Sequence, residues 1–236
     1  MDDRWTLLPE GLDTPTVLID VDVLERNVTS WAQRLAARGV GLRPHTKTSK
    51  CVEVIRRQVA AGVVGLSVAT LGEAEALADA GFSDLFQAYP VWAGRPDRAR
   101  RVRELHERVA LMVGVESVES AAALGAAVAG SERMLPVLIE IDPGLHRSGV
   151  DPAEVVEIAR AADAAGLEIR GAFTFGGHGY ATCDAAPQAG DDEVDRPAVD
   201  GILERRRRAG SEQSVDGRHG HGGKCRRSAA APPSTE

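Results

Sequence analysis

The sequence of 236 residues has few aromatic side chains, few cysteines and no excess of positive charge. Aromatic residues make up 4% of the chain, so a core would be built mainly from Ala, Val, Leu and Ile. The formal net charge of -7 argues against a nucleic-acid partner, because nucleic-acid-binding proteins present a basic surface. The three cysteines have neither disulfide-framework nor metal-site spacing, so they predict unpaired thiols and no metal site.

Long apolar stretches are also missing. No run approaches the roughly 18 apolar residues that a membrane-spanning helix requires. The first residues, 1–9, contain two aspartates and lack the apolar block of a signal peptide. We therefore expect a cytoplasmic protein with no membrane partner.

Between residues 14 and 175, short apolar runs alternate with longer amphipathic segments. The expected strands are 16–20, 40–44, 64–69, 84–89, 109–115, 135–141 and 167–175. The expected helices are 23–38, 51–61, 71–80, 96–106, 117–129 and 152–165, and Gly39, Gly81 and Gly166 stand where glycine caps a helix. This alternation predicts an α/β fold in which helices cover a mostly parallel sheet.

Two α/β architectures fit this pattern, a TIM-type (β/α)8 barrel and an open doubly wound sheet. The open sheet usually carries a glycine-rich phosphate loop after its first strand. No such loop follows the first apolar runs. The barrel is therefore favoured.

The segment 42–50 follows an expected strand and contains Lys47. Barrel enzymes place reactive groups at the carboxyl ends of strands. A lysine that forms a Schiff base must be partly neutral, and Arg43, His45 and Lys50 could supply a cationic field that favours neutrality. From these residues alone, Lys47 and Lys50 could equally be solvated loop lysines.

Two further loops follow expected strands. In the segment 139–149, Arg147 could donate to an anionic oxygen, or could form an ordinary surface ion pair. In the segment 171–180, His178 and Tyr180 could contact a flat ring, or could simply be exposed. Parallel strands would bring these loops together with Lys47 on one barrel face. That combination suits an aldehyde cofactor that bears a phosphate.

Five segments also resemble one known family. Residues 43–50, Arg-Pro-His-Thr-Lys-Thr-Ser-Lys, are similar to the Arg-Pro-His-x-Lys-Thr-His-Lys signature of D-threonine aldolases and eukaryotic-type D-serine dehydratases, with Ser49 in place of the usual His. Residues 68–75, 142–149 and 173–180 resemble further motifs of this branch of the alanine racemase-like enzymes, as does the opening segment 13–20. The resemblance covers about residues 12–204.

The resemblance implies an alanine racemase N-terminal domain-like barrel with pyridoxal 5'-phosphate bound to Lys47, the catalytic residue. It further implies that His45, Arg147, His178 and Tyr180 bind the cofactor, with Arg147 on the ring oxygen. The implied reaction is a lyase reaction on D-3-hydroxy amino acids, by a homodimer acting on a small amino-acid substrate. Intact relatives also carry a β-rich domain with a divalent metal held by a His-x-Cys or His-x-Asp pair.

The sequence supplies about six barrel strands, and it has no candidates for the seventh and eighth after Glu204. We therefore expect a partial barrel domain over residues 1–204 and a disordered tail over 205–236, which contains no Leu, Ile or Phe after residue 210. His219, His221 and Cys225 do not reproduce the metal pair of the family. The abrupt change near Arg205 suggests a truncated or frame-shifted copy, which could be inactive.

Two alternatives stay open at this point. One is an amino-acid racemase of the same fold, and the other is a non-catalytic protein that binds pyridoxal phosphate. The Arg-Pro-His start of the lysine motif favours the lyase branch.

Overall fold

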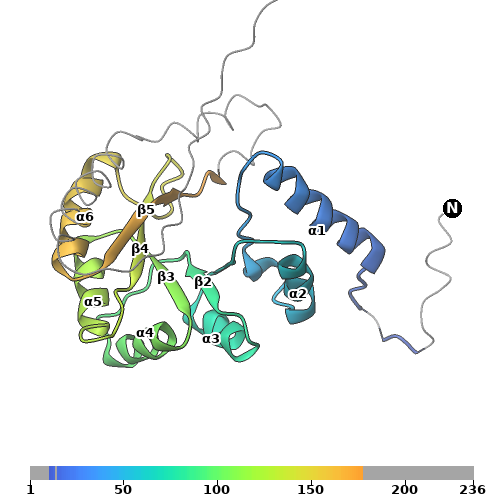
Figure 1. The fold of residues 1–236 in the computed structure, drawn as a ribbon, viewed down its shortest axis with the longest axis horizontal. Coiled ribbons are helices and arrows are strands. Elements are labelled where there is room, and N and C mark those ends of the chain that lie inside the picture. The colour runs from blue at the N-terminus through green and yellow to red at the C-terminus, as the bar shows by residue number, and fades with distance from the viewer. Residues whose placement is uncertain (1–10, 14, 178–236) are drawn as a thin grey trace, which may run out of the picture.

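The computed structural model describes residues 11–13 and 15–177, whose framework is one sheet of five parallel strands (Figure 1). The strands are β1 (Leu66–Val68), β2 (Asp84–Gln87), β3 (Ala110–Val115), β4 (Pro136–Ile141) and β5 (Glu168–Thr174), and they lie side by side in chain order. Each neighbouring pair is parallel. Within the described residues the sheet does not close. This is the strand order of a (β/α) barrel that is left open.

A helix follows each of the first four strands. The helices are α1 (Val21–Ala36), α2 (Val52–Ala60), α3 (Leu71–Asp79), α4 (Pro96–Arg108), α5 (Val118–Ala127) and α6 (Val155–Ala164), with short 3-10 turns η2 (Thr46–Thr48) and η3 (Pro152–Glu154). Gly39, Gly81 and Gly166 follow α1, α3 and α6 with φ of 71°, 92° and 75°, as expected of glycine caps. The six expected helices are therefore confirmed, with small shifts at their ends.

The two faces of the sheet differ in composition. Side chains on the outer face pack against α3–α6 and are almost all aliphatic and fully buried: Leu66, Val68, Leu85, Leu111, Val113, Val115, Val137, Ile139 and Ile141. Side chains on the inner face alternate with them and are more varied: Ser67, Phe86, Met112, Gly114, Leu138, Glu140 and Phe173. The outer face therefore forms the main core, and the inner face is available for a site.

The expected strand 40–44 is not a regular strand. Its backbone accepts hydrogen bonds from the segment of β1, Val64 N to Leu42 O at 2.8 Å and Ser67 N to Pro44 O at 2.8 Å. A single parallel bridge joins His45 to Ser67. Pro44 has no N–H, so it can accept but not donate in a ladder. The segment thus lies beside β1 at the edge of the sheet in an irregular extended conformation, and the prediction of a regular strand was wrong.

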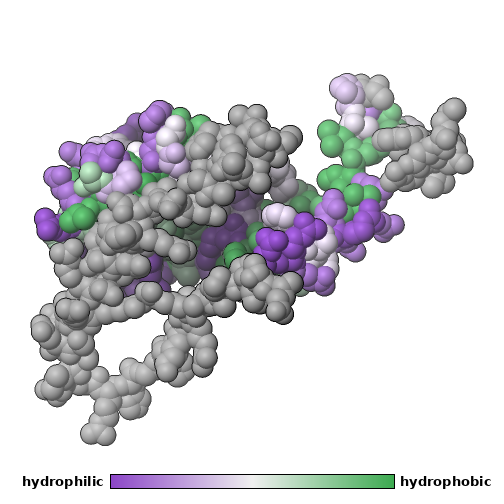
Figure 2. Space-filling model, turned by 90° about the horizontal axis from the view of Figure 1, so that it is seen from above, coloured by the Kyte–Doolittle hydropathy of each residue, from purple (hydrophilic) through white to green (hydrophobic). Residues whose placement is uncertain are grey.

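The expected strand 16–20 is also absent as a strand. Val17 is 90% exposed and Ile19 57% exposed, and neither pairs with a strand in the described part of the chain. A β-strand needs a neighbour to satisfy its backbone groups, and alternation of residue type cannot supply one. Apolar surface on this N-terminal side is visible in Figure 2.

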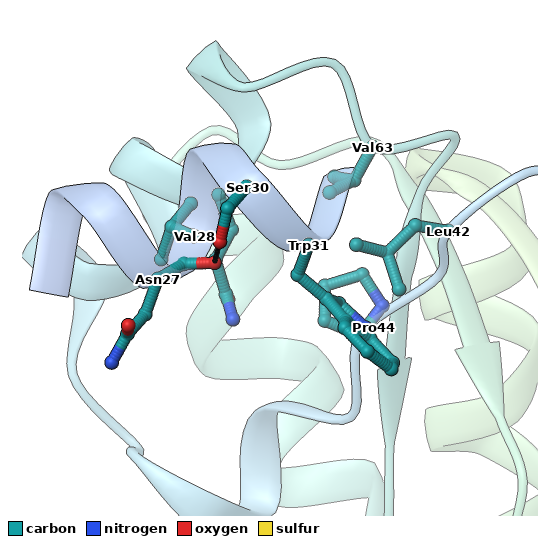
Figure 3. A pocket seen from close by; sticks show the side chains of 8 residues that line it. Asn27, Val28, Ser30, Trp31, Leu42, Pro44 and Val63 are labelled. Atoms are coloured by element: carbon teal, nitrogen blue, oxygen red, sulfur yellow. Dashed lines mark hydrogen bonds between the residues drawn. The ribbon is translucent and has the colours of Figure 1, made fainter. Parts of the chain in front are cut away.

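Helix α1 begins at Val21, where the Asp20 carboxylate accepts a hydrogen bond from Val23 N at 3.0 Å. Ala32 is the only buried residue of this helix. A groove of about 490 Å³ separates α1 from the edge of the sheet and is lined by Asn27, Val28, Ser30, Trp31, Leu42, Pro44, Gln58 and Val63 (Figure 3). Helix α1 therefore packs more loosely than α3–α6.

Several predictions fall outside the described residues. These are the roles of His178 and Tyr180, the domain boundary at residue 204, and the tail from 205 to 236. None of the helices in the described ranges is both long and apolar enough to cross a membrane.

Candidate active site

Lys47 lies at the carboxyl end of the irregular edge segment, in the turn η2. The turn is fixed to β1 because the buried Thr46 hydroxyl donates to Ser67 O at 3.1 Å. Lys47 itself is exposed. The fold therefore holds the backbone of this lysine rigidly and leaves its amino group accessible.

His45 caps the same turn. Its Nδ1 accepts a hydrogen bond from Lys47 N at 3.4 Å. Burial lowers the pKa of His45 below 6.5, and the neighbouring positive charge of Lys47 lowers it further. The ring is therefore neutral at physiological pH, and with Nδ1 as acceptor its proton resides on Nε2. His45 thus presents one N–H donor to its surroundings.

The other two cations expected around Lys47 are bound elsewhere. Arg43 pairs with Asp84 at 2.7 Å, at the amino end of β2. Lys50, whose φ is 46°, pairs with Glu73 at 3.1 Å. The positive field expected from neighbouring basic residues is consequently reduced by two carboxylates.

The loop after β4 has a backbone that explains its two glycines. Gly144 and Gly149 have φ of 101° and 93°, values that favour glycine. A Cβ at Gly149 would lie 2.7 Å from Asp142 N, so there is no room for a side chain. The bridge between Ile141 and Val150 closes the loop at its base. The loop is thus compact, and its two ends are held together.

Asp142 holds the interior of this loop. Its carboxylate accepts hydrogen bonds from Gly144 N at 3.0 Å and His146 N at 3.0 Å, and it pairs with His146 Nδ1 at 2.8 Å. The hydrogen bond from the His146 backbone, with those from Gly144 and the His146 ring, lowers the pKa of Asp142. The Asp-x-Gly-x-x-Arg-x-Gly pattern therefore encodes a self-supporting loop that aims Arg147.

Arg147 projects from this loop over the carboxyl end of the sheet. Its Cζ lies 4.0 Å from the centroid of the Phe175 ring and 5.7 Å from that of Tyr89. Stacking of a guanidinium on aromatic faces limits its motion while leaving N–H groups at the edges free to donate. The side chain is 35% exposed, so Arg147 is oriented yet accessible.

Phe175 brings Arg147 and Lys47 together. Lys47 Nζ lies 5.7 Å from the centroid of the same ring. Phe175 follows β5, and Thr174 next to it donates from its hydroxyl to Ile141 O at 2.9 Å, which ties the end of β5 to β4. Two of the residues predicted for the site thus meet around one ring, as the convergence of parallel strand ends requires.

Glu140, on the inner face of β4, was not predicted as a site residue from the sequence. Only 2% of this residue is exposed, and burial raises the pKa of its carboxyl. Its Oε1 accepts from the Ser148 hydroxyl at 2.8 Å and lies 3.9 Å from Arg147 Nη2. A glutamate inside the apolar run 137–141 was the available signal, because buried strands rarely contain an unpaired charge.

No group of three or more His, Cys, Asp or Glu side chains within the described ranges could hold a metal ion. His178 and Tyr180, predicted to bind the cofactor, lie beyond residue 177. Of the predicted site residues, the structure therefore places Lys47, His45 and Arg147 on one edge of the sheet.

Comparison with known proteins agrees with this fold. The family model of the alanine racemase N-terminal domain matches residues 19–212. The D-threo-3-hydroxyaspartate dehydratase of Delftia sp. (strain HT23) is 36% identical over 218 residues, covering 91% of this chain and 53% of that protein. The 3-hydroxy-D-aspartate aldolase of Paracoccus denitrificans is 36% identical over 157 residues, covering 65% of this chain and 40% of that protein.

Among solved structures, D-threonine aldolase from Filomicrobium marinum superimposes with a TM-score of 0.75 and 27% identity, covering 82% of this chain and 53% of that chain. The chain thus spans about half the length of these relatives. The match confirms the predicted fold, an α/β barrel of which the described residues form five strands in an unclosed sheet. By sequence and by structure, this chain belongs to the alanine racemase N-terminal domain family.

Proposed function

We propose that the chain supplies the cofactor-binding barrel of a pyridoxal-phosphate-dependent lyase that acts on D-3-hydroxy amino acids. The observation that carries the proposal is the meeting of Lys47 and Arg147 around the ring of Phe175 at the carboxyl edge of the sheet. Barrel enzymes bind their substrates at this edge.

The side chains at this edge fit the chemistry of the cofactor. Lys47 supplies an amine for its aldehyde, Arg147 supplies planar N–H donors for its ring oxygen, and Phe175 supplies an apolar surface. When bound, pyridoxal phosphate withdraws electrons from the bonds at the substrate Cα. Barrels commonly bind phosphate at the loops after the seventh and eighth strands, for which this sequence offers no candidates.

Each side chain then has a defined task. Lys47 Nζ would hold the cofactor, and it could take up or return a proton there. Arg147, which lies over the rings of Phe175 and Tyr89, would donate to the ring oxygen of the cofactor. His45 Nε2–H, set by the hydrogen bond at Nδ1, is a neutral donor beside Lys47.

The choice of a lyase rests on the relatives. The dehydratase of Delftia sp. and the aldolase of Paracoccus denitrificans are both named for 3-hydroxyaspartate, and the structural relative is a D-threonine aldolase. A D-amino acid with a hydroxyl on Cβ is common to these names. The homodimer and the divalent metal stay predictions from the resemblance, and the cytoplasmic location stays a prediction from the sequence.

Absorption spectroscopy with added pyridoxal phosphate tests cofactor binding. A band at about 420 nm, the absorption expected of the lysine-bound cofactor, should form in the wild-type chain and disappear in Lys47→Ala. Lys50→Ala is the matched control, because Lys50 lies in the same segment and pairs with Glu73. Loss of the band in Lys50→Ala but not in Lys47→Ala would contradict the assignment of Lys47.

Turnover assays test the reaction class. Consumption of D-threonine, D-serine or D-3-hydroxyaspartate in the presence of a divalent metal supports the lyase. Exchange of the α-proton of alanine without consumption of these substrates points to a racemase instead.

A further inference from the structure

Glu140 is a buried carboxylate with unused hydrogen-bonding capacity. It lies on the inner wall of the sheet, directly below the loop that carries Arg147, and 2% of it is exposed. Its Oε1 accepts from the Ser148 hydroxyl at 2.8 Å. Its Oε2 is buried and has no hydrogen-bond partner within the described part of the chain. A buried oxygen without a hydrogen-bond partner destabilises the fold, so its presence calls for a functional explanation.

The charged groups around Glu140 are arranged unevenly. Burial raises the pKa of its carboxyl and the charges of Glu116 and Asp142 raise it further, whereas the Ser148 hydroxyl and Arg147 lower it. Arg147 is the only cation among these influences, and its Nη2 lies 3.9 Å from Oε1. This distance exceeds that of a hydrogen bond, but Arg147 Nε donates to Ser148 Oγ at 3.4 Å, and the same hydroxyl donates to Glu140, so the two charges are also linked through Ser148.

Resting on the function proposed above, we propose that Glu140 is a positioning residue for Arg147. Its carboxylate holds one edge of the guanidinium, and the opposite edge is then directed at the ring oxygen of pyridoxal phosphate. A guanidinium carries five N–H donors in a planar fork, so it can serve a carboxylate and a ligand at once. The Ser148 hydroxyl, next to Arg147 in the chain, braces the carboxylate from the same loop.

The main test compares two carboxylates beside this loop. Glu140→Gln preserves shape and an acceptor for Ser148 but removes the charge that faces Arg147. Glu116→Gln is the matched control, because Glu116 accepts from Gly149 N at 3.1 Å and an amide oxygen can do the same. We expect the apparent Kd for pyridoxal phosphate to rise about tenfold in Glu140→Gln, the usual effect of losing a charged hydrogen-bond partner, and to change less than about twofold in Glu116→Gln.

A double-mutant cycle shows whether Glu140 acts through Arg147. If it does, Glu140→Gln should add little to the loss of affinity already caused by Arg147→Ala. The absorption maximum of the bound cofactor should also move in Glu140→Gln and stay in place in Glu116→Gln. Fully additive losses, or an unchanged maximum, would overturn the proposal.

NMR of the Arg147 side chain tests the same contact without cofactor. In the wild-type chain the Nε–H and guanidinium signals should indicate restricted motion that is lost in Glu140→Gln but retained in Glu116→Gln. Identical Arg147 signals in wild type and Glu140→Gln would overturn the proposal. A wild-type chain that fails to bind pyridoxal phosphate would refute the proposed function, and these signals would still decide the role of Glu140.

Discussion

The two faces of the same five strands are built for different purposes. Leu111, Val113 and Val115 on the outer face of β3 are fully buried beneath helices. On the inner face, the strands carry the polar side chains of Ser67 and Glu140. Period-2 alternation sends successive residues to opposite faces, so one strand can contribute to both. The outer face stabilises the fold, whereas the inner face retains a buried charge that opposes folding.

Truncation of an outer-face leucine should have the largest effect on stability. Leu111→Ala removes a side chain that is fully buried, so we expect the free energy of unfolding to fall by about 2–5 kcal/mol. Leu18→Ala is the matched control, because Leu18 is 42% exposed outside the sheet, and its effect should stay within about 0.5 kcal/mol. Chemical denaturation followed by circular dichroism measures both. Equal losses would contradict the idea that the core lies on the outer face.

A smaller effect is expected where the helical layer is packed most closely. A Cβ at Gly125 in α5 would lie 2.4 Å from Ala165 O, so Gly125→Ala should destabilise the chain by about 1–3 kcal/mol. Gly72 in α3 has only a flexible arginine end within 4 Å of the added Cβ, at 3.9 Å. Gly72→Ala should therefore be neutral or stabilise by up to about 1 kcal/mol. Thermal denaturation of the two variants measures the difference. A higher melting temperature for Gly125→Ala than for Gly72→Ala would contradict the close contact between Gly125 and Ala165.

The inner face should respond in the opposite direction, and with the smallest change. Burial raises the pKa of Glu140 in the folded state above its ordinary value of 4.5. The folded chain therefore binds this proton more tightly than the unfolded chain, and the stability that the protonated group contributes is lost as the pH rises through the folded pKa. The amide of Glu140→Gln does not titrate, so the variant lacks this dependence of stability on pH.

We therefore expect Glu140→Gln to become more stable than wild type as the pH is raised from 4.5 toward neutrality. Denaturation midpoints across that interval, compared with those of Glu116→Gln, measure the effect. A wild-type chain that gained stability over Glu140→Gln as the pH rose would show that the carboxylate is already fully compensated by Arg147.

The predictions made from sequence succeeded where the signal was local and repeated. Helix positions followed from the spacing of apolar residues. Their ends followed from glycines such as Gly81 and Gly166, which adopt the positive φ of a helix cap without strain. The residues 43–50 and 142–149 were recognisable because their turns are encoded within a few positions. Segments 16–20 and 40–44 were misread as regular strands, because a strand depends on a neighbour that its own sequence does not specify.

The site was foreseen only in part, for a related reason. Lys47 and Arg147 were predicted as site residues from their loops together with the family resemblance, but their meeting around Phe175 depends on the order of strands in the sheet. Glu140 escaped notice because its importance lies in its burial and in the 3.9 Å to Arg147, which no local pattern encodes.

The sequence by itself determined the class of fold, the helices and the loops that carry Lys47 and Arg147. Only the tertiary structure decided which face of β5 each residue occupies. Val137 of β4 pairs with Ile169, but its neighbour Leu138 pairs with Gly171, so Arg170 is an extra residue, a bulge, that shifts the register of β5. Simple alternation would put Ile169 and Phe173 on one face, but after the bulge Ile169 packs in the outer core and Phe173 stacks edge-on against Phe86, 5.1 Å between ring centroids. Such a shift follows from pairing between strands, which the sequence of one strand does not contain.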